Sequence, residues 1–366
     1  MCEPGFPQGR WSVRQLLVWA LVALFAPGPR AQAYPISPET LWSLTQEAEW
    51  VVWADVEEEW GLSEEEYKAA EKEDWESGRV TRLRIREGWK GTARKGEQVE
   101  VHWMPSMCPS PPRYEKGLAV VAFLARRAGK WRTVSLSYGT RYPANDDDVG
   151  AYRRAVTLAR SAQDKWTQER IVGRSTDIEA ARVDWQVRIS VHPATRWDGL
   201  YGLVPRSDAA RSFFDTHLGN RVLLTDAQRE ELARGFVERP PLDHALPMML
   251  TALRGHVDKG VDQAAARALE TVLSQGECMG WVFQALELLR ERQGEGLPSR
   301  ESLTPEEQWT RRIEDIRRSA LNLEAKELAE FTREWASFKQ RHQLTPALLP
   351  LPVAPPVDGT GGNTTF

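Results

Sequence analysis

The hydrophobic pattern of this chain changes its period near residue 143, and this change divides the sequence into two kinds of structure. Before it, apolar and polar residues alternate in the segments 80–86 and 99–103, as in half-buried strands. Segment 118–125 is almost wholly apolar, which is typical of a strand buried on both faces. After residue 143, apolar residues recur every three or four positions, the helical spacing. The sequence therefore predicts an α+β protein whose β part comes first.

The β part contains five strand-like segments, namely 50–56, 80–86, 99–103, 118–125 and 131–138. Short strands separated by turn residues predict a small barrel or sandwich. The acidic segment 64–74 begins with a capping box, so we expect an exposed helix inserted between strands. These features predict a β domain over residues 34–145.

The helical part is expected to form an all-α domain over residues 146–342, and the Pro-, Gly- and Thr-rich residues 343–366 are expected to form a disordered tail. Its longest amphipathic pattern is predicted to be one helix from 305 to 342, opened by Thr304 as the N-cap. The apolar stripe of this helix needs a partner surface. That surface lies either in this chain or in a second copy, so the pattern allows self-association through the 305–342 helix.

Residues 1–33 have the pattern of a secretory signal peptide. Arg10 and Arg14 precede an apolar run from Leu16 to Ala26, and Ala31-Gln32-Ala33 supplies small side chains for cleavage between Ala33 and Tyr34. A helix of eleven residues spans about 16 Å, roughly half of a bilayer core. We therefore expect an exported protein, periplasmic or extracellular, with no integral membrane segment in the mature chain.

The charge of the chain argues against nucleic acid as a partner. Loss of residues 1–33 removes three arginines and one glutamate, so the net charge falls from −4 to −6. Proteins that bind nucleic acid as a whole usually carry a basic balance, because phosphate neutralisation supplies much of their affinity. An unidentified protein partner is the expected alternative, and no cofactor is expected.

The N-terminal pattern resembles the netrin-like domain, the OB-type barrel that also occurs in tissue inhibitors of metalloproteinases. The resemblance rests on residues 49–56, 83–91 and 114–124, and on the Pro-rich loop around Cys108. It covers roughly residues 37–143. It implies that the β part is a five-stranded OB-like β-barrel, which the all-α helical domain follows.

Two departures limit what the resemblance implies about function. Metalloproteinase inhibition in that family depends on a cysteine at the mature N-terminus, where this chain is predicted to have Tyr34. The loop cysteine of similar domains has a partner after the last strand, where this chain has Ser137-Tyr138-Gly139. Two alternatives therefore remain for Cys108. It forms a disulfide with Cys278, as an oxidising compartment allows, or both cysteines stay free and act as small buried hydrophobic residues.

The sequence contains no HExxH, GxSxG, P-loop, GxGxxG or CxxC motif, so the common motif-borne chemistries and metal sites lack support. The expected function is that of an exported, non-enzymatic protein-interaction or binding module. The alternative is an exported hydrolase or metal-dependent enzyme that uses His192 and Asp198, since imidazole and carboxylate serve as metal ligands or as an acid–base pair. The competing interpretation is that these residues stabilise helix ends.

One candidate binding surface lies in the predicted barrel. Arg82, Arg84 and Arg86 share a strand face near Trp89, and such a basic stripe beside an aromatic ring can hold an anionic polymer. The competing interpretation is a solvated face whose arginines pair with Glu97 and Glu100 on the neighbouring strand.

Overall fold

The structure is a computed structural model that describes residues 38–73, 78–105, 110–173, 177–206, 214–216, 222–276, 278–296 and 303–350. The predicted signal peptide with its cleavage site at Ala33 and Tyr34, Cys108 and the last sixteen residues of the predicted tail lie outside the described residues. Predictions that concern them are not tested by the fold.

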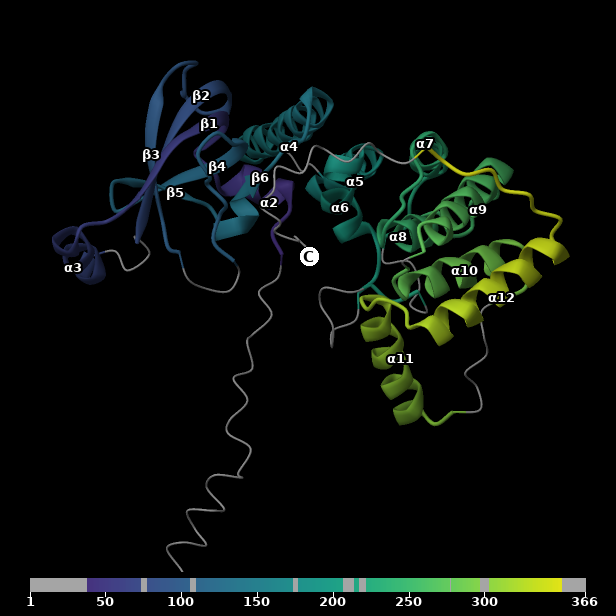
Figure 1. The fold of residues 1–366 in the computed structure, drawn as a ribbon. Coiled ribbons are helices and arrows are strands. Elements are labelled where there is room, and N and C mark those ends of the chain that lie inside the picture. Colours follow the sequence, from purple (N-terminus) through teal and green to yellow (C-terminus); the bar gives the residue numbers. More distant parts are fainter. Residues whose placement is uncertain are drawn as a thin grey trace, which may run out of the picture. The chain divides into compact units, whose positions relative to one another are not determined.

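The β part is a closed five-stranded barrel of mixed strand direction, followed by helices, as predicted (Figure 1). The strand order is β1-β2-β3-β5-β4, and β4 also pairs with β1, which closes the sheet. All these pairings are antiparallel except β3 with β5. The elements are α2 (Leu41–Glu47), β1 (Trp50–Gly61), α3 (Glu64–Glu73), β2 (Arg79–Lys90), β3 (Gln98–Trp103), β4 (Ala119–Arg127), β5 (Lys130–Thr133), η1 (Leu136–Gly139) and β6 (Thr140–Arg141).

The long strand β1 makes this closure possible. Residues 50–55 pair with β4 and residues 51–61 pair with β2, so β1 is shared by two neighbours. Its pairing with β2 shifts register at three places, each of them a bulge or irregularity. Bulges bend a strand and increase its twist, and a small barrel needs strongly bent strands to close.

Strand β4 and the first residues of β1, which pair with each other, have buried side chains on both faces. Val52 of β1 and Val120 of β4 belong to the cluster inside the barrel, whereas Val51 and Phe123 belong to a cluster that includes helical residues. The near-continuous apolar run 118–125 is explained by this double burial, which confirms the prediction of a central strand.

The predicted strand 131–138 is too long. β5 ends at Thr133, and the 3₁₀ turn η1 precedes the two-residue strand β6. Ser135 and Leu136 have φ values of 52° and 53°, in the left-handed region, which no β-strand can accommodate. The prediction of a single strand over 131–138 is therefore wrong after Thr133, where the chain forms a turn.

The helical part contains α4 (Asp146–Ile171), α5 (Ile178–Ser190), α6 (Pro193–Leu203), α7 (Asp226–Glu238), α8 (Ala245–Ala252), α9 (Lys259–Ser274), α10 (Trp281–Arg292), α11 (Pro305–Ser319) and α12 (Ala325–Arg341). Trp42 of α2 and Trp185 of α5 pack edge to face, with ring centroids 5.3 Å apart. Both belong to the cluster that also holds Val51 and Phe123. This cluster contains residues from both sides of position 145, the predicted domain boundary. Whether residues 34–145 and 146–342 fold independently of each other stays a prediction.

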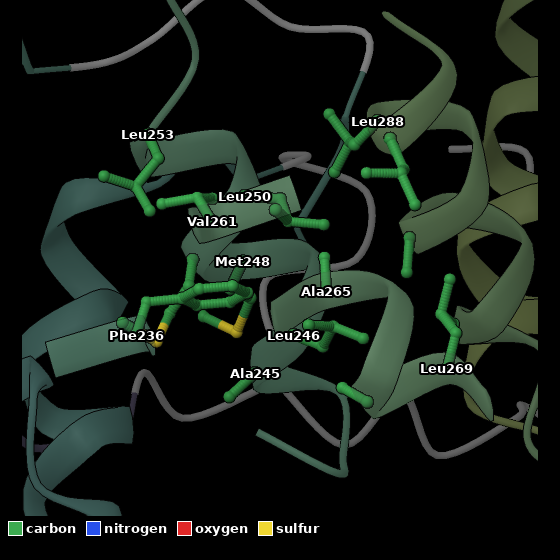
Figure 2. Close-up of a cluster of buried hydrophobic side chains, with 14 of the residues drawn as sticks. Phe236, Ala245, Leu246, Met248, Leu250, Leu253, Val261, Ala265, Leu269 and Leu288 are labelled. Carbon is green, nitrogen blue, oxygen red and sulfur yellow. The ribbon is translucent and has the colours of Figure 1, made fainter. Parts of the chain in front are cut away.

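A third cluster, the largest, forms the core of the following helices. Figure 2 shows part of it, where Phe236 of α7 lies near Leu246 and Met248 of α8. Val261 and Leu269 come from α9 and lie on the same side of that helix, as the helical spacing predicts.

The predicted helix 305–342 is wrong as a single element, because it is divided into α11 and α12 (Figure 1). Asn322 forms a β-bridge with Met279 instead of continuing the helix. The backbone of Leu321 accepts a hydrogen bond of 2.8 Å from Gly280, and Leu323 donates one of 2.7 Å to Cys278. These contacts with the segment before α10 compete with the helical hydrogen bonds and end α11.

The apolar stripe of α12 packs inside this chain. Phe331, Trp335 and Phe338 are 0–2% exposed and belong to the largest cluster. They are therefore part of the core rather than a seam between copies. On α11, Trp309 is 46% exposed.

Candidate functional site

The predicted basic stripe on β2 is neutralised by carboxylates. The ion pairs are Arg82 with Glu58 and Glu100, Arg84 with Glu57, and Arg86 with Asp55. Three of these four acidic residues lie on β1 rather than on β3, where the sequence placed the partners. Hydrogen bonds to Glu100 and Asp55 raise the pKa of Arg82 and of Arg86. The stripe is a ladder of partly exposed ion pairs across two strands.

Trp89 does not share a face with the three arginines. Its side chain is 7% exposed and belongs to the cluster with α4, while Arg84 and Arg86 are exposed. The alternation of a strand places residue 89 opposite residues 82, 84 and 86. The indole that stacks under Arg86 is instead Trp53 of β1, with 4.8 Å between the guanidinium carbon and the ring centroid.

His192 and Asp198 lie at different places on α6 and have different partners. His192 is the N-cap, whose Nδ1 accepts a hydrogen bond of 3.2 Å from the backbone N–H of Ala194. Its Nε2 lies 3.0 Å from a carboxylate oxygen of Asp147. Asp198 is 2% exposed and pairs with Arg141. The structure therefore gives these two residues stabilising contacts and does not bring them together.

An open groove of about 510 Å³ lies between α4, α5 and α7, which are labelled in Figure 1. The small or apolar residues that line it are Ala151, Leu158, Ile189, Val191 and Gly235. The rest of the lining is mostly charged. The cationic residues are Arg154, Arg188, Arg234 and Arg239, and the acidic ones are Asp147, Glu231 and Glu238.

One end of the groove is held together by Asp147. Its Oδ2 lies 3.0 Å from Nε2 of His192 and 3.0 Å from a guanidinium nitrogen of Arg239. Asp147 is in the first turn of α4, where a negative charge is favoured by the helix dipole. Hydrogen bonds from His192 and Arg239 lower the pKa of Asp147. This contact joins α4 to the start of α6 and the end of α7.

Three groove arginines, Arg154, Arg188 and Arg234, have no such partner. Within the part of the chain that the structure describes, none of them makes an ion pair or a side-chain hydrogen bond. All three are exposed. Their guanidinium groups keep all their hydrogen-bond donors available, and guanidinium donors suit carboxylate and phosphate oxygens.

The sequence alone does not single out Arg154, Arg188 and Arg234. Each arginine is an exposed residue on a helix, where charged side chains are ordinary. A signal exists only within α4, because Asp147, Arg154 and Leu158 are separated by seven and four positions and so share a face. The contributions of α5 and α7 depend on how the three helices pack.

The structure leaves the predicted bridge between Cys108 and Cys278 untested, because Cys108 is not described. Among the described cysteines, Cys278 is a buried free thiol that donates to the carbonyl of Val272 at 3.7 Å. Burial raises the pKa of this thiol.

Comparisons of the chain with protein-family models, with curated proteins and with solved structures find no match. In the described residues, no three histidine, cysteine, aspartate or glutamate side chains are grouped so that they could hold a metal ion. The helices that the structure describes include none that is both long and apolar enough to cross a bilayer.

Proposed function

We propose that this protein is an exported, non-enzymatic binding module that holds an acidic segment of another protein in the α4–α5–α7 groove. The observation that carries the proposal is the availability of Arg154, Arg188 and Arg234 in one hollow. The arginines of the barrel stripe differ, since each of them is already paired with a carboxylate. An acidic partner would supply the groove arginines with carboxylates, which the chain itself supplies to the arginines of the barrel stripe.

The shape of the groove supports a segment of protein as the ligand. Its apolar lining residues offer contact area for aliphatic or aromatic side chains, while its charged lining residues can fix the orientation of a ligand. A groove with both features fits an amphipathic helix, which presents an apolar stripe between charged flanks. A small anion would use the arginines but leave the apolar lining residues uncovered.

The contacts of His192 and Asp198 favour binding over chemistry. Both ring nitrogens of His192 are engaged, one as the cap of α6 and one with Asp147. Oδ1 of Asp198 accepts hydrogen bonds from Arg141 and from the backbone of Leu41. A general base needs to reach a proton of the substrate, and neither group is presented for that role.

The export part of the proposal is supported by the signal-peptide pattern of residues 1–33. N-terminal sequencing of the protein recovered from outside the cytoplasm tests the export. We expect the sequence to begin at Tyr34. Recovery of a chain that begins at Met1 would contradict it.

Binding is tested with a fluorescent, glutamate-rich amphipathic helical peptide and the purified chain. Arg188→Glu together with Arg234→Glu should raise the Kd by about tenfold or more, because each reversal replaces attraction by repulsion at about 1 kcal/mol. Added salt should weaken binding to the unchanged protein.

The matched control is Arg311→Glu together with Arg317→Glu on α11. Both of these arginines are exposed, and neither has an ion-pair partner among the residues described. This control has the same change in net charge but leaves the groove intact, so its Kd should stay close to that of the unchanged chain. Equal weakening by both variants would mean that only net charge matters and would reject the groove as the site.

A further inference from the structure

The chain that follows α12 turns back and passes α9 (Figure 1). Gln343 has a φ value of 52°, in the left-handed region, and the backbone N–H of Leu344 donates a hydrogen bond of 2.9 Å to the carbonyl of Lys339. This geometry is that of a Schellman turn, which ends a helix and sends the chain in a new direction. Residues 344–350 after the turn contain no helix or strand and are called the strap below.

Two leucines hold the strap on the helices. Leu344 and Leu349 are half-buried, and both pack against the largest core cluster, to which Leu269 and Val272 of α9 belong. The residues between these two leucines are mostly exposed, including Leu348 at 57%. The strap therefore covers part of the core cluster with two separate aliphatic contacts.

A backbone contact with α9 accompanies the second leucine. The N–H of Leu349 donates a hydrogen bond of 2.8 Å to Oγ1 of Thr271, whose hydroxyl donates to the carbonyl of Arg267 at 2.7 Å. Every residue except proline offers a backbone N–H, so this bond holds an extended chain whatever its side chains are. The leucine contacts select aliphatic side chains. Main-chain bonds for affinity and side-chain contacts for specificity are the means by which proteins bind extended peptides.

The strap is held less firmly than the helices that it covers. None of its seven residues is buried, and in the described structure the bond to Thr271 is the one hydrogen bond that residues 345–350 make. Segments with few buried apolar contacts and an exposed backbone open at a small free-energy cost while the core stays folded. Opening of the strap uncovers the hydroxyl of Thr271 and the apolar surface beneath the leucines.

We propose that the strap occupies, within its own chain, a docking surface on α9 for an extended, leucine-bearing segment of a partner protein. The partner presents a backbone N–H to Thr271 and a leucine in place of Leu349. This inference is independent of the proposed function, because all residues that line the α4–α5–α7 groove precede α9. A tethered strap competes at an effective concentration on the order of 1 mM, so it sets the affinity that a partner needs.

A partner protein is favoured over a second copy of this chain by the number of contacts. Exchange of straps between two copies replaces each contact by an identical one and still costs the entropy of association. A segment of another protein can add contacts of its own beyond the strap. The unoccupied surface is therefore expected to serve a different chain.

The first test releases the strap in the full-length chain with Leu344→Ser and Leu349→Ser. The probe is a fluorescent peptide with the sequence of residues 343–350. It should bind the released chain at least tenfold more tightly than the unchanged chain, in which the strap competes. A peptide with serine at both leucine positions should bind at least tenfold more weakly than the first peptide. Circular dichroism of the released chain checks that the helices are retained.

A matched pair of threonine variants locates the surface. The hydroxyls of Thr271 and Thr332 each donate to the carbonyl four residues earlier, at 2.7 Å, but Thr271 also accepts the bond from the strap. In the released chain, Thr271→Val should weaken binding of the peptide about three- to tenfold, as the loss of one hydrogen bond predicts. Thr332→Val, on the exposed side of α12, should leave the binding unchanged.

Hydrogen exchange of the unchanged chain tests the opening without any substitution. The amide of Leu349 should exchange at least tenfold faster than that of Val272, which lies in the core cluster on α9. Its rate should not respond to low concentrations of urea, because opening of the strap exposes little surface. This measurement stays decisive if the released chain fails to fold.

Three results would overturn the inference. They are a peptide that does not bind the folded, released chain, a peptide that binds the released and the unchanged chain equally, and exchange of the Leu349 amide only by global unfolding. A dimer of the unchanged chain that grows with concentration and is dissociated by the peptide would assign the surface to the strap of a second copy and overturn the partner.

Discussion

Arg141 and Asp198 form a buried ion pair, in which a guanidinium nitrogen of Arg141 lies 2.8 Å from Oδ1 of Asp198. Their side chains are 14% and 3% exposed. The same carboxylate oxygen accepts a hydrogen bond of 2.9 Å from the backbone N–H of Leu41. The start of α2, the strand β6 and the helix α6 therefore meet at one carboxylate, although they are far apart in the sequence.

Asp198→Ala should lower the free energy of unfolding by about 3–5 kcal/mol, because it leaves the guanidinium of Arg141 buried without its counter-charge. Urea denaturation measures this change. The control is Asp164→Ala, which removes an exposed ion pair with Arg160 one helical turn away and should cost less than about 1 kcal/mol. Similar losses in the two variants would show that the buried pair has no special role.

Gly91→Ala should destabilise the protein more than Gly96→Ala. Both glycines have positive φ values, of 85° and 83°, so each substitution should cost about 1–2 kcal/mol for the left-handed backbone. A Cβ atom at Gly91 would also lie 2.6 Å from the carbonyl oxygen of Glu49 and would collide with the ring of Trp50, whereas the space at Gly96 is open. Such overpacking adds about 1–3 kcal/mol. Equal urea midpoints would contradict the close approach at Gly91.

Phe331→Ala should cost about 3–5 kcal/mol, because this side chain is fully buried in the core cluster and its removal leaves a cavity. Trp309→Ala on α11 should change the stability by less than about 1 kcal/mol, since that ring is 46% exposed. Thermal or urea unfolding compares the two variants. A larger loss of stability in Trp309→Ala than in Phe331→Ala would contradict the assignment of Phe331 to the core.

The contribution of Asp147 to stability should depend on pH. Its pKa is lowered in the folded state by hydrogen bonds from His192 and Arg239, so the folded state favours the carboxylate. The stabilisation is therefore present above the unfolded pKa of about 3.9 and is lost as the pH falls through the lower, folded value.

The measurement is the urea midpoint of the unchanged chain and of Asp147→Asn between neutral pH and about pH 3. The difference between the two should shrink as the pH falls. Glu238→Gln is the control, because Glu238 lines the same groove but forms no ion pair in the described structure. Its curve should run parallel to that of the unchanged chain. A constant offset for Asp147→Asn would exclude the pH-dependent contact.

Cys278 should resist alkylation in the native protein, because its thiol is buried and its pKa is raised by that burial. Labelling of the exported, non-reduced protein in denaturant then counts the free thiols. Two labelled thiols would exclude the predicted bridge between Cys108 and Cys278, and none would support it. If the bridge forms, the chain-entropy model predicts about 5 kcal/mol of stabilisation, which reductant should remove.

Local signals in the sequence predicted most of the fold. Capping residues mark helix starts directly, and Thr304 is the N-cap of α11, as its sequence pattern predicts. The two-sided burial of β4 follows from its apolar run. These features depend on neighbours within a few residues, so a single sequence contains them.

Features that depend on distant contacts were not predictable in the same way. The break between α11 and α12 depends on the pairing of Asn322 with Met279, which lies 43 positions earlier in the chain. The partners of the arginine stripe were placed on β3, whereas most lie on β1, because the sequence does not give the strand order. The groove required the packing of α4, α5 and α7, and no single helix reveals that Arg188 and Arg234 face one hollow.

The closure of the barrel limits how another protein can recognise it. Each of the five barrel strands that the structure describes has a hydrogen-bonded neighbour on both sides, and β6 covers a further part of β4. An incoming peptide can therefore extend the sheet only where a strand runs past its neighbour, as residues 57–61 of β1 run past the segment that pairs with β4. Such edge extension is the route that many peptide-binding domains and many aggregating proteins use. Elsewhere on the barrel a partner must recognise side chains rather than the backbone, so its specificity there can be changed by surface substitutions that leave the fold intact.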